Sequence, residues 1–398
     1  MDKLIQYSNT RINAVNTIFK RYLWTKVNWK NRLNIITGAR GVGKTTMLLQ
    51  YIKENLFHTP DEVIFVNLDD LFFARNSLVD FVDEFVKRGG KHILIDEVHK
   101  YKNWSQEVKN IYDYFPELKI IITGSSALDI YKGEADLSRR AILYKLNGLS
   151  FREFIELKYG YKFSILPLET ILEDSAKEVS QMLKKIKPIK LFEEYLNTGY
   201  YPFFNEGEQE YPTRLKQTVN HILDNDLTSV ENIDYNSVYK LRKLVSIVSE
   251  ISPFKPNISK LSMQIGVSRD TLIKYLYLLE RADLLILLQS DTHGISRMNK
   301  PEKVYLNNPN LITNLSSNPY EVGTVRETFF CNQLRVGHSL AYSPNGDFLV
   351  DNKYTIEIGG KHKTRKQIIG LERAYIAADN IEYKSKHKIP LWLFGFLY

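Results

Sequence analysis

Eight residues near the N-terminus have the types and the spacing of a phosphate-binding loop. Residues 38–45 read GARGVGKT, which fits the pattern G-x-x-x-x-G-K-(S/T). Glycines let the backbone turn its N–H groups toward phosphate oxygens, and the start of a following helix adds its dipole. Lys44 can then reach the β- and γ-phosphates, and the Thr45 hydroxyl can hold Mg²⁺. The expected nucleotide contacts are Gly38, Ala39, Arg40, Gly41, Val42, Gly43, Lys44, Thr45 and Thr46.

The loop needs a strand before it and a helix after it, and the flanking residues predict both. Residues 33–37 form a short apolar run that is typical of a buried strand. Residues 45–54 place Met47, Leu48 and Tyr51 at the spacing of a helix with one apolar face. A chance glycine-rich turn would lack this context, so the sequence predicts a site for ATP and Mg²⁺.

Two adjacent carboxylates supply what hydrolysis needs beyond nucleotide binding. Residues 92–97 read HILIDE, an apolar run that ends in Asp96 and Glu97. Asp96 fits the role of holding Mg²⁺ through its water shell, together with Thr45. Glu97 fits a general base that polarises the attacking water. The alternative is a pair of solvated acids at a strand end, which the upstream loop makes the poorer interpretation.

A third apolar run, residues 119–123, ends in hydroxyl side chains. Thr123, Ser125 and Ser126 each carry a polar group that can sense the γ-phosphate, and each can instead cap the next helix. We slightly favour Ser125 as the sensor. Strands separated by helices predict an open parallel α/β sheet, in which ligands bind at the carboxyl ends of the strands.

These motifs resemble a family of AAA-type P-loop ATPases from archaea and bacteria. Members of this family carry a DUF4143-like, restriction-endonuclease-like domain at the C-terminus. Arg40 and Trp104 stand where the family commonly has the same residues. Residues 191–202 resemble its small helical subdomain, which packs beside the nucleotide. The resemblance rests on residues 38–46, 94–104, 121–126 and 149–154.

The same family has a Gly-Arg pair before the strand that leads to residues 149–154. Here Arg139 and Arg140 stand at the pair, so the glycine is replaced and the arginine matches at Arg140. The resemblance implies that Arg140 contacts the γ-phosphate as an arginine finger, in cis or from a neighbouring subunit. Surface charges at the end of a loop are the alternative.

Residues 258–276 have the pattern of a helix–turn–helix motif. Gly266 supplies the turn and Ser268 caps the second helix. Apolar runs at 284–288 and 303–306 predict two strands, which together with the helices make a winged helix. Cations at the start of the second helix suit a reader of the DNA major groove, and a contact with protein alone is the alternative. The candidate DNA contacts are Arg269 and Lys274.

Two carboxylates face each other across a predicted hairpin near the C-terminus. A three-residue loop centred on Asn352 pairs residue 350 with residue 354, and therefore Asp347 with Glu357. Like charges at opposite positions destabilise a hairpin unless a metal or another cation lies between them.

Together with Glu327 from the preceding helix, Asp347 and Glu357 resemble the Mg²⁺ site of restriction-endonuclease-like domains. Those nucleases carry a lysine two residues after the last acid, where this chain has Gly359. Lys361 lies on the same face by strand alternation and is the candidate substitute. The alternative is a fold that is kept for binding after its nuclease chemistry has been lost.

Composition fits a cytoplasmic protein with several domains. A chain of 398 residues with 43% apolar residues exceeds one ordinary core. It has no apolar stretch near the roughly 20 residues that span a bilayer, and no signal-peptide pattern. The single cysteine excludes an internal disulfide. The net charge of +8 mildly favours a polyanionic partner.

We therefore expect an α/β protein: an AAA-like P-loop NTPase sheet, a small helical subdomain, a winged helix and a C-terminal α/β restriction-endonuclease-like domain. The expected function is a cytosolic Mg²⁺-dependent ATPase that couples ATP hydrolysis to a DNA-binding or DNA-processing C-terminal half. The alternative is an ATP-gated switch for protein interaction or signalling, with an inactive nuclease-like domain. DNA, a protein partner or further copies of the chain are the expected partners. The expected domain boundaries are 1–160, 161–235, 236–308 and 309–398.

Overall fold

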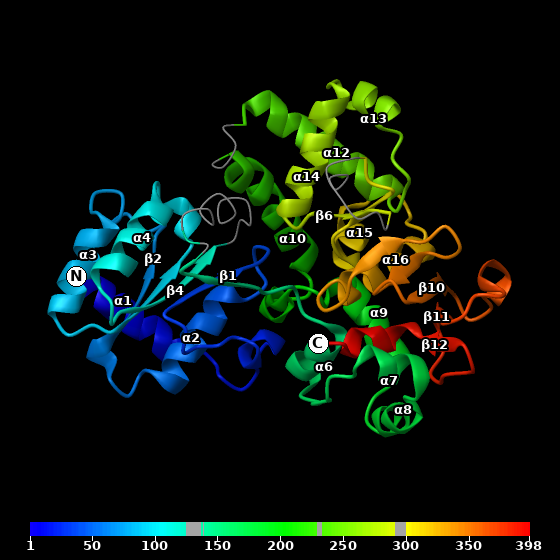
Figure 1. Cartoon of the computed structure of the whole chain (residues 1–398), viewed down its shortest axis with the longest axis horizontal. Coiled ribbons are helices and arrows are strands. Elements are labelled where there is room, and N and C mark those ends of the chain that lie inside the picture. Colours follow the sequence, from blue (N-terminus) through cyan, green and yellow to red (C-terminus); the bar gives the residue numbers. More distant parts are fainter. Residues whose placement is uncertain (125–136, 138, 229–232, 291–299) are drawn as a thin grey trace. The chain divides into compact units, whose positions relative to one another are not determined.

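The computed structural model describes the chain except residues 125–136, 138, 229–232 and 291–299 (Figure 1). The chain divides into two compact units. The first unit contains Met1–Asn147 and Asn225–Asn232, and the second contains Gly148–Asp224 and Ile233–Tyr398. The finer division into four domains stays a prediction.

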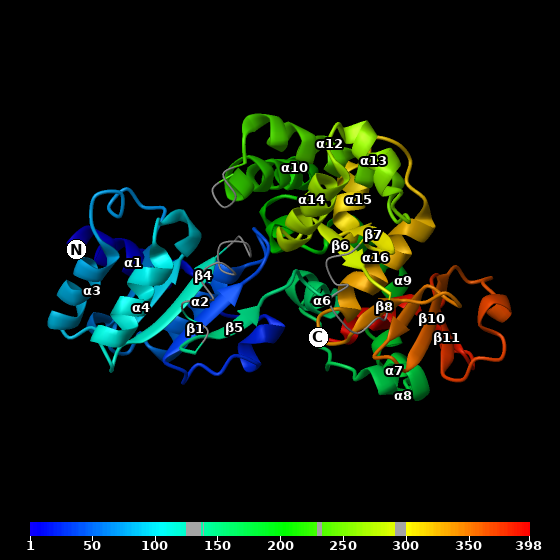
Figure 2. The same ribbon diagram turned by 45° about the horizontal axis from the view of Figure 1, so that its top comes forward.

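The first unit is built on a parallel five-stranded sheet in the order β2-β3-β4-β1-β5. Figure 2 shows β4, β1 and β5 as neighbours in this sheet. The strands are short and mostly buried, as expected when helices cover both faces of a parallel sheet. They are β1 (Leu33–Thr37), β2 (Val63–Asn67), β3 (His92–Asp96), β4 (Lys119–Gly124) and β5 (Ile142–Lys145).

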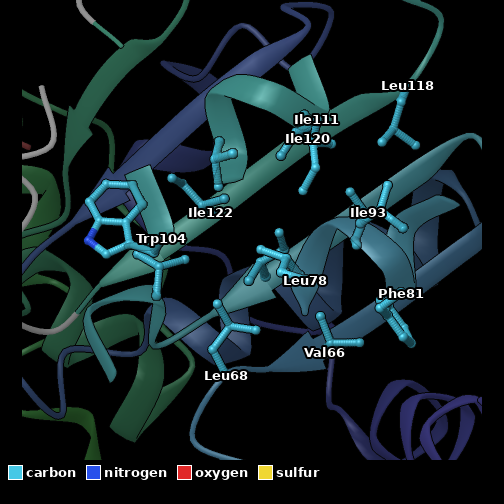
Figure 3. Close-up of a cluster of buried hydrophobic side chains, with 14 of the residues drawn as sticks. Val66, Leu68, Leu78, Phe81, Ile93, Trp104, Ile111, Leu118, Ile120 and Ile122 are labelled. Carbon is cyan, nitrogen blue, oxygen red and sulfur yellow. The ribbon is translucent and has the colours of Figure 1, made fainter. Parts of the chain in front are cut away.

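Helices α3 and α4 bury their apolar sides against strands β2, β3 and β4 (Figure 3). Leu78 and Phe81 of α3 and Ile111 of α4 are almost fully buried in this cluster. Ser77 begins α3 by accepting a hydrogen bond from the backbone of Asp80. The helices of this unit are α1 (Asp2–Ala14), α2 (Lys44–Asn55), α3 (Leu78–Lys87) and α4 (Trp104–Tyr114). Among the described residues of the whole chain, no helix is long and apolar enough to cross a bilayer.

Aromatic side chains join distant parts of the second unit. The ring of Phe151 lies 5.6 Å from that of Tyr195 and 5.8 Å from that of Phe396. Tyr195 also lies 5.9 Å from Phe329. The helices of this part of the second unit are α6 (Phe151–Tyr159), α7 (Leu168–Glu173), α8 (Ala176–Leu183), α9 (Pro188–Thr198), α10 (Tyr211–His221), α15 (Pro309–Leu315) and α16 (Val322–Leu334).

The predicted helix–turn–helix segment forms two helices, and the two strands predicted after it pair in antiparallel direction. Gly266 adopts a left-handed φ of 76° after the first helix, and Ser268 accepts a hydrogen bond from the Thr271 backbone at the start of the second. The strands pair Leu285 with Leu306. The elements are α12 (Tyr235–Ile251), α13 (Ile258–Ile265), α14 (Arg269–Arg281), β6 (Leu285–Leu288) and β7 (Lys303–Leu306). That these elements act as a winged helix stays a prediction.

A second five-stranded sheet, of mixed direction, has the order β12-β11-β10-β9-β8. Helix α16 packs against β10 (Figure 2). Val350 pairs with Tyr354, so the predicted loop of three residues is confirmed. The ladder ends at Phe348 and Ile356, one residue short of the acidic pair. The strands are β8 (Leu340–Tyr342), β9 (Phe348–Val350), β10 (Tyr354–Gly359), β11 (Ala374–Ala378) and β12 (Lys388–Pro390).

Candidate nucleotide-binding site

The glycine-rich loop connects β1 to α2, and all three of its glycines have conformations that other residues rarely adopt. Gly43 has a φ of 96° at the start of α2. Gly38 has a φ of 155°, and a Cβ atom at this position would lie 2.2 Å from the Leu146 carbonyl oxygen. These glycines are therefore required by the turn itself and by the close approach of neighbouring backbone.

Lys44 lies inside the loop rather than in solvent. Its side chain is buried, and Nζ donates hydrogen bonds to the carbonyl oxygens of Gly38 (2.8 Å) and Ala39 (2.9 Å). The ammonium group is thus held at the first turn of α2, where the helix dipole also favours anions. A phosphate bound by the loop would meet this charge directly.

Asp96 joins the ends of three neighbouring segments. One carboxylate oxygen, Oδ2, accepts a hydrogen bond of 2.7 Å from Thr45, and Oδ1 accepts one from Thr123 at the end of β4. Burial raises the pKa of Asp96, as does the charge of Glu97, while the two hydroxyls and Lys44 oppose this rise. The candidate γ-phosphate sensor with a described position is therefore Thr123. Ser125, which we favoured, lies outside the described residues.

A hollow of about 230 Å³ lies at the carboxyl ends of β2 and β3. Its wall presents hydroxyl, amide and carboxylate oxygens, which are the ligands that Mg²⁺ prefers. Thr45 and Asp96 therefore fit the predicted metal-binding role by chemistry and by mutual position. The lining residues are Tyr7, Arg11, Arg40, Thr45, Phe65, Asn67, Asp69, Asp96 and Glu97.

Glu97 lines this hollow with an unusual backbone conformation. Its φ of 55° and ψ of 41° are left-handed, which costs a residue other than glycine about 1–3 kcal/mol. Its Oε2 lies 3.4 Å from His99 Nε2 and 3.9 Å from Arg40 Nη1. These contacts place the carboxylate beside Asp96 at the edge of the hollow, and its role as general base stays a prediction.

Sequence reasoning missed five of the nine residues in this wall, among them Asn67, Tyr7 and Arg11. Asn67 ends β2 and pairs in register with Asp96, so its position at a carboxyl strand end was a usable signal. Tyr7 and Arg11 come from α1, which precedes every recognised motif and offered no such signal. Of the predicted loop contacts, Thr46 is exposed on the first turn of α2.

Arg140 is not brought to the loop of its own chain. Its guanidinium binds both oxygens of Asp113 on α4, each at 3.0 Å. It precedes β5, which begins where Ile142 pairs with Asn34 of β1, whereas the loop follows β1 at its other end. The prediction of an arginine finger in cis is therefore wrong, because the strand lies between Arg140 and the phosphates. A role from a neighbouring copy stays a prediction.

The three C-terminal carboxylates lie near one another, but two lysines neutralise them. Lys303 Nζ lies 3.0 Å from Glu327 and 3.6 Å from Asp347, and Lys363 Nζ lies 2.5 Å from Glu357. Burial raises the pKa of Glu327, and the charge of Asp347 adds to this effect. Within the described residues, no group of three or more His, Cys, Asp and Glu side chains is arranged to hold a metal. The nuclease-type metal site stays a prediction.

Lys363, not the expected Lys361, fills the place beside Glu357. A Cβ atom at Gly359 would lie 2.6 Å from the Lys363 side chain, so the glycine makes room for this lysine. Lys361 is exposed. Its prediction assumed that strand alternation continued, but β10 ends at Gly359 and the chain turns there.

The predicted DNA contacts lie on α14. Arg269 is exposed at its first turn and Lys274 is exposed one turn further along. Arg269 lines an open hollow of about 550 Å³ at the N-terminal ends of α13 and α14. Lys255 and Lys300 line the same hollow and were missed, because both lie outside the helix–turn–helix pattern.

Two family models match separate segments of the chain. Residues 30–155 match a family described as an AAA domain, and residues 189–321 match a domain of unknown function, DUF8612. The five-stranded parallel sheet fits a P-loop NTPase fold, and the first match makes residues 30–155 similar to AAA domains, which supports nucleotide binding. The second match shows that the expected DUF4143-like domain was wrong.

A curated relative is similar along most of the chain. It is an uncharacterized protein, MJ1637, of Methanocaldococcus jannaschii, with 26% identity over 377 residues. The similarity covers 86% of this chain and 78% of the relative. The similarity to this relative therefore extends over both matched segments of the chain.

Three solved structures are similar only at a TM-score of 0.25. PCH-2 of C. elegans is 19% identical, and the match covers 39% of this chain and 44% of that one. AMPPCP-bound DnaA from Aquifex aeolicus is 16% identical, with 69% and 86% covered. A DNA replication initiation factor is 15% identical, with 75% and 87% covered. Because these scores are low, we draw no conclusion about this chain from them.

Proposed function

We propose that this protein is a Mg²⁺-dependent ATPase whose nucleotide cycle controls DNA binding by its second unit. The ATPase part is supported above all by Asp96, which accepts hydrogen bonds from both Thr45 and Thr123. The nucleotide loop, the end of β3 and the end of β4 thus meet at one carboxylate. Such convergence at the carboxyl edge of the sheet is the arrangement that phosphoryl transfer requires.

The reaction that this geometry supports is in-line attack of water on the γ-phosphate. Lys44 neutralises phosphate charge from within the loop, and Glu97 orients the water and accepts its proton. Thr45 and Asp96 would hold Mg²⁺, which when bound supplies further charge neutralisation at the β- and γ-phosphates. Thr123 stands where it can report the presence of the γ-phosphate to Asp96.

Removal of Mg²⁺ tests the metal part of this proposal. We expect phosphate release from ATP to fall by about 100-fold or more when EDTA is added in excess, because a metal contributes several kcal/mol to charge stabilisation. The measurement is a coupled phosphate assay, with restoration by added Mg²⁺ as the control. A rate that persists in EDTA would contradict the assignment of Thr45 and Asp96 as metal-binding residues.

The DNA part is supported by the charges at the start of α14. Arg269, Lys255 and Lys300 line one hollow together with Asp270, and residues at the N-terminal ends of α13 and α14 form part of its wall. This combination suits phosphate groups of a nucleic-acid backbone. The alternative function, an ATP-gated protein-interaction switch, is favoured by Lys303 and Lys363, which neutralise the C-terminal carboxylates without a metal.

Salt dependence of duplex binding distinguishes these two functions. We expect the double substitution Arg269→Ala and Lys274→Ala to weaken binding and to reduce the slope of log K against log salt by about 1–2 units. Fluorescence anisotropy of a labelled duplex measures both quantities. Lys177→Ala on α8 removes an equally exposed lysine and serves as the control. No detectable affinity of the unmodified protein at low salt would favour the protein-interaction switch.

A further inference from the structure

A short segment of the C-terminal half belongs to the nucleotide-binding unit. Residues 225–232 group with the first unit, whereas the chain before and after them, including α10 and α12, belongs to the second. The segment lies inside the DUF8612 match and outside the AAA match. The described part of this segment includes Asp226, whose side chain is 3% exposed.

Asp226 contacts the residues that follow the candidate catalytic base. Its Oδ1 lies 3.4 Å from Lys100 Nζ and 3.9 Å from His99 Nε2. The same His99 nitrogen lies 3.4 Å from Glu97 Oε2, and the His99 side chain is fully buried. One imidazole nitrogen therefore lies near both the carboxylate of Asp226 and that of Glu97.

The charge of Asp226 is stabilised where it lies. Burial alone would raise the pKa of this carboxyl group. The interaction with His99 and the charges of His99, Lys100 and Arg40 outweigh burial, so the pKa is lowered. Asp226 is thus ionised at neutral pH and attracts both His99 and Lys100.

Glu97 needs such support because its own segment is short and strained. It begins a turn of only three residues, Val98–Lys100, from a left-handed conformation. A catalytic group that moves by about 1 Å can lose roughly 100-fold in rate. Because Asp226 and Glu97 approach the same nitrogen of His99, the charge of Asp226 helps to set where this nitrogen lies and therefore where the Glu97 carboxylate can approach it.

We propose that Asp226 is a positioning residue for ATP hydrolysis, acting on Glu97 through His99. ATP turnover thereby depends on residues 225–228, which belong to the first unit but lie between two segments of the second unit along the chain. A rearrangement of α10 or α12 that withdraws this stretch would release His99 and slow hydrolysis without removing any loop contact to the nucleotide. The inference rests on the proposed ATPase function and names a means of regulating it.

The test is the substitution Asp226→Asn in the full chain. We expect kcat to fall about 10-fold, while KM and the Kd for a fluorescent ATP analogue change less than twofold. Asp224→Asn is the matched control, because Asp224 lies in the same π-helix (Ile222–Asp226) but pairs with Arg242 in the second unit. This control should retain the unmodified kcat.

A double-substitution cycle separates positioning from a general structural role. His99→Gln alone should lower kcat to a similar extent, and adding Asp226→Asn should have little further effect, because the two residues act in one chain of contacts. Additive losses, or an equal loss of ATP affinity, would overturn the proposal. If Asp226→Asn does not fold, Asp226→Glu, which displaces the same charge, provides the same readout.

Glu97→Gln, measured in parallel, keeps the two proposals apart. If Glu97→Gln stops turnover while Asp226→Asn behaves like the unmodified protein, the positioning role is wrong and the ATPase function stands. If the unmodified protein releases no phosphate with Mg²⁺, the ATPase function fails and the positioning role fails with it.

Discussion

ATP turnover by a Glu97→Gln variant is expected to fall by about 10²–10⁴-fold, with ATP binding retained. Glutamine keeps the size of the side chain and the left-handed backbone position but cannot accept a proton from water. The carboxylate lines the hollow beside Asp96, so no loop contact to the phosphates is removed. Single-turnover phosphate release and the Kd for a fluorescent ATP analogue measure the two effects independently.

The control for this variant is a glutamate outside the hollow. Glu54→Gln alters an ion pair with Lys20 near the end of α2 and should leave turnover unchanged. An unchanged rate in Glu97→Gln would rule out the role of Glu97 as base. A loss of ATP binding equal to the loss of rate would instead show that Glu97 acts in the ground state.

Loss of nucleotide affinity is the expected result of Lys44→Ala. Charged hydrogen bonds contribute about 1.5–3 kcal/mol each, so the Kd for ATP should rise by about 100-fold. The lysine also bonds the carbonyl oxygens of Gly38 and Ala39, and its removal therefore loosens the loop itself. Titration of a fluorescent ATP analogue gives the Kd, and a thermal melt shows whether the fold is kept.

Lys53→Ala provides a close comparison on the same helix. Lys53 Nζ also donates to two backbone carbonyl oxygens, those of Asn13 and Val15, but it lies at the far end of α2 from the loop. Its substitution should leave ATP affinity within about twofold. If Lys44→Ala melts normally and still binds ATP with an affinity near that of the unmodified protein, the loop does not act through this lysine.

The parts of the candidate site that depend on local backbone conformation could be predicted from the sequence. Gly43 ends its loop with a positive φ because the following helix starts there, and a motif of eight residues encodes this geometry. Asp96 and Thr123 could be foreseen together because parallel strands end at one edge of a sheet. The error at Arg140 came from not applying the same rule, since this arginine precedes a predicted strand and therefore lies at the opposite edge of the sheet from the loop.

Contacts between distant residues could not be read from any pattern. Lys100 and Asp226 are 126 positions apart, and no periodicity or motif connects them. Lys363 was missed for a local reason, because alternation was extended past the end of β10 at Gly359. In both cases the missing information was where the chain turns, which depends on packing rather than on residue type.

The divided first unit also determines the order in which its parts are made. Residues 1–147 leave the ribosome before Asp226 exists, and the stretch Gly148–Asp224 is synthesised in between. At about 5–20 residues per second, that interval lasts roughly 4–15 s. During this time the nucleotide loop can form while His99 and Lys100 lack their acidic partner. Under the roles proposed for the loop and for Asp226, the nascent chain would bind ATP before it could turn ATP over at its full rate.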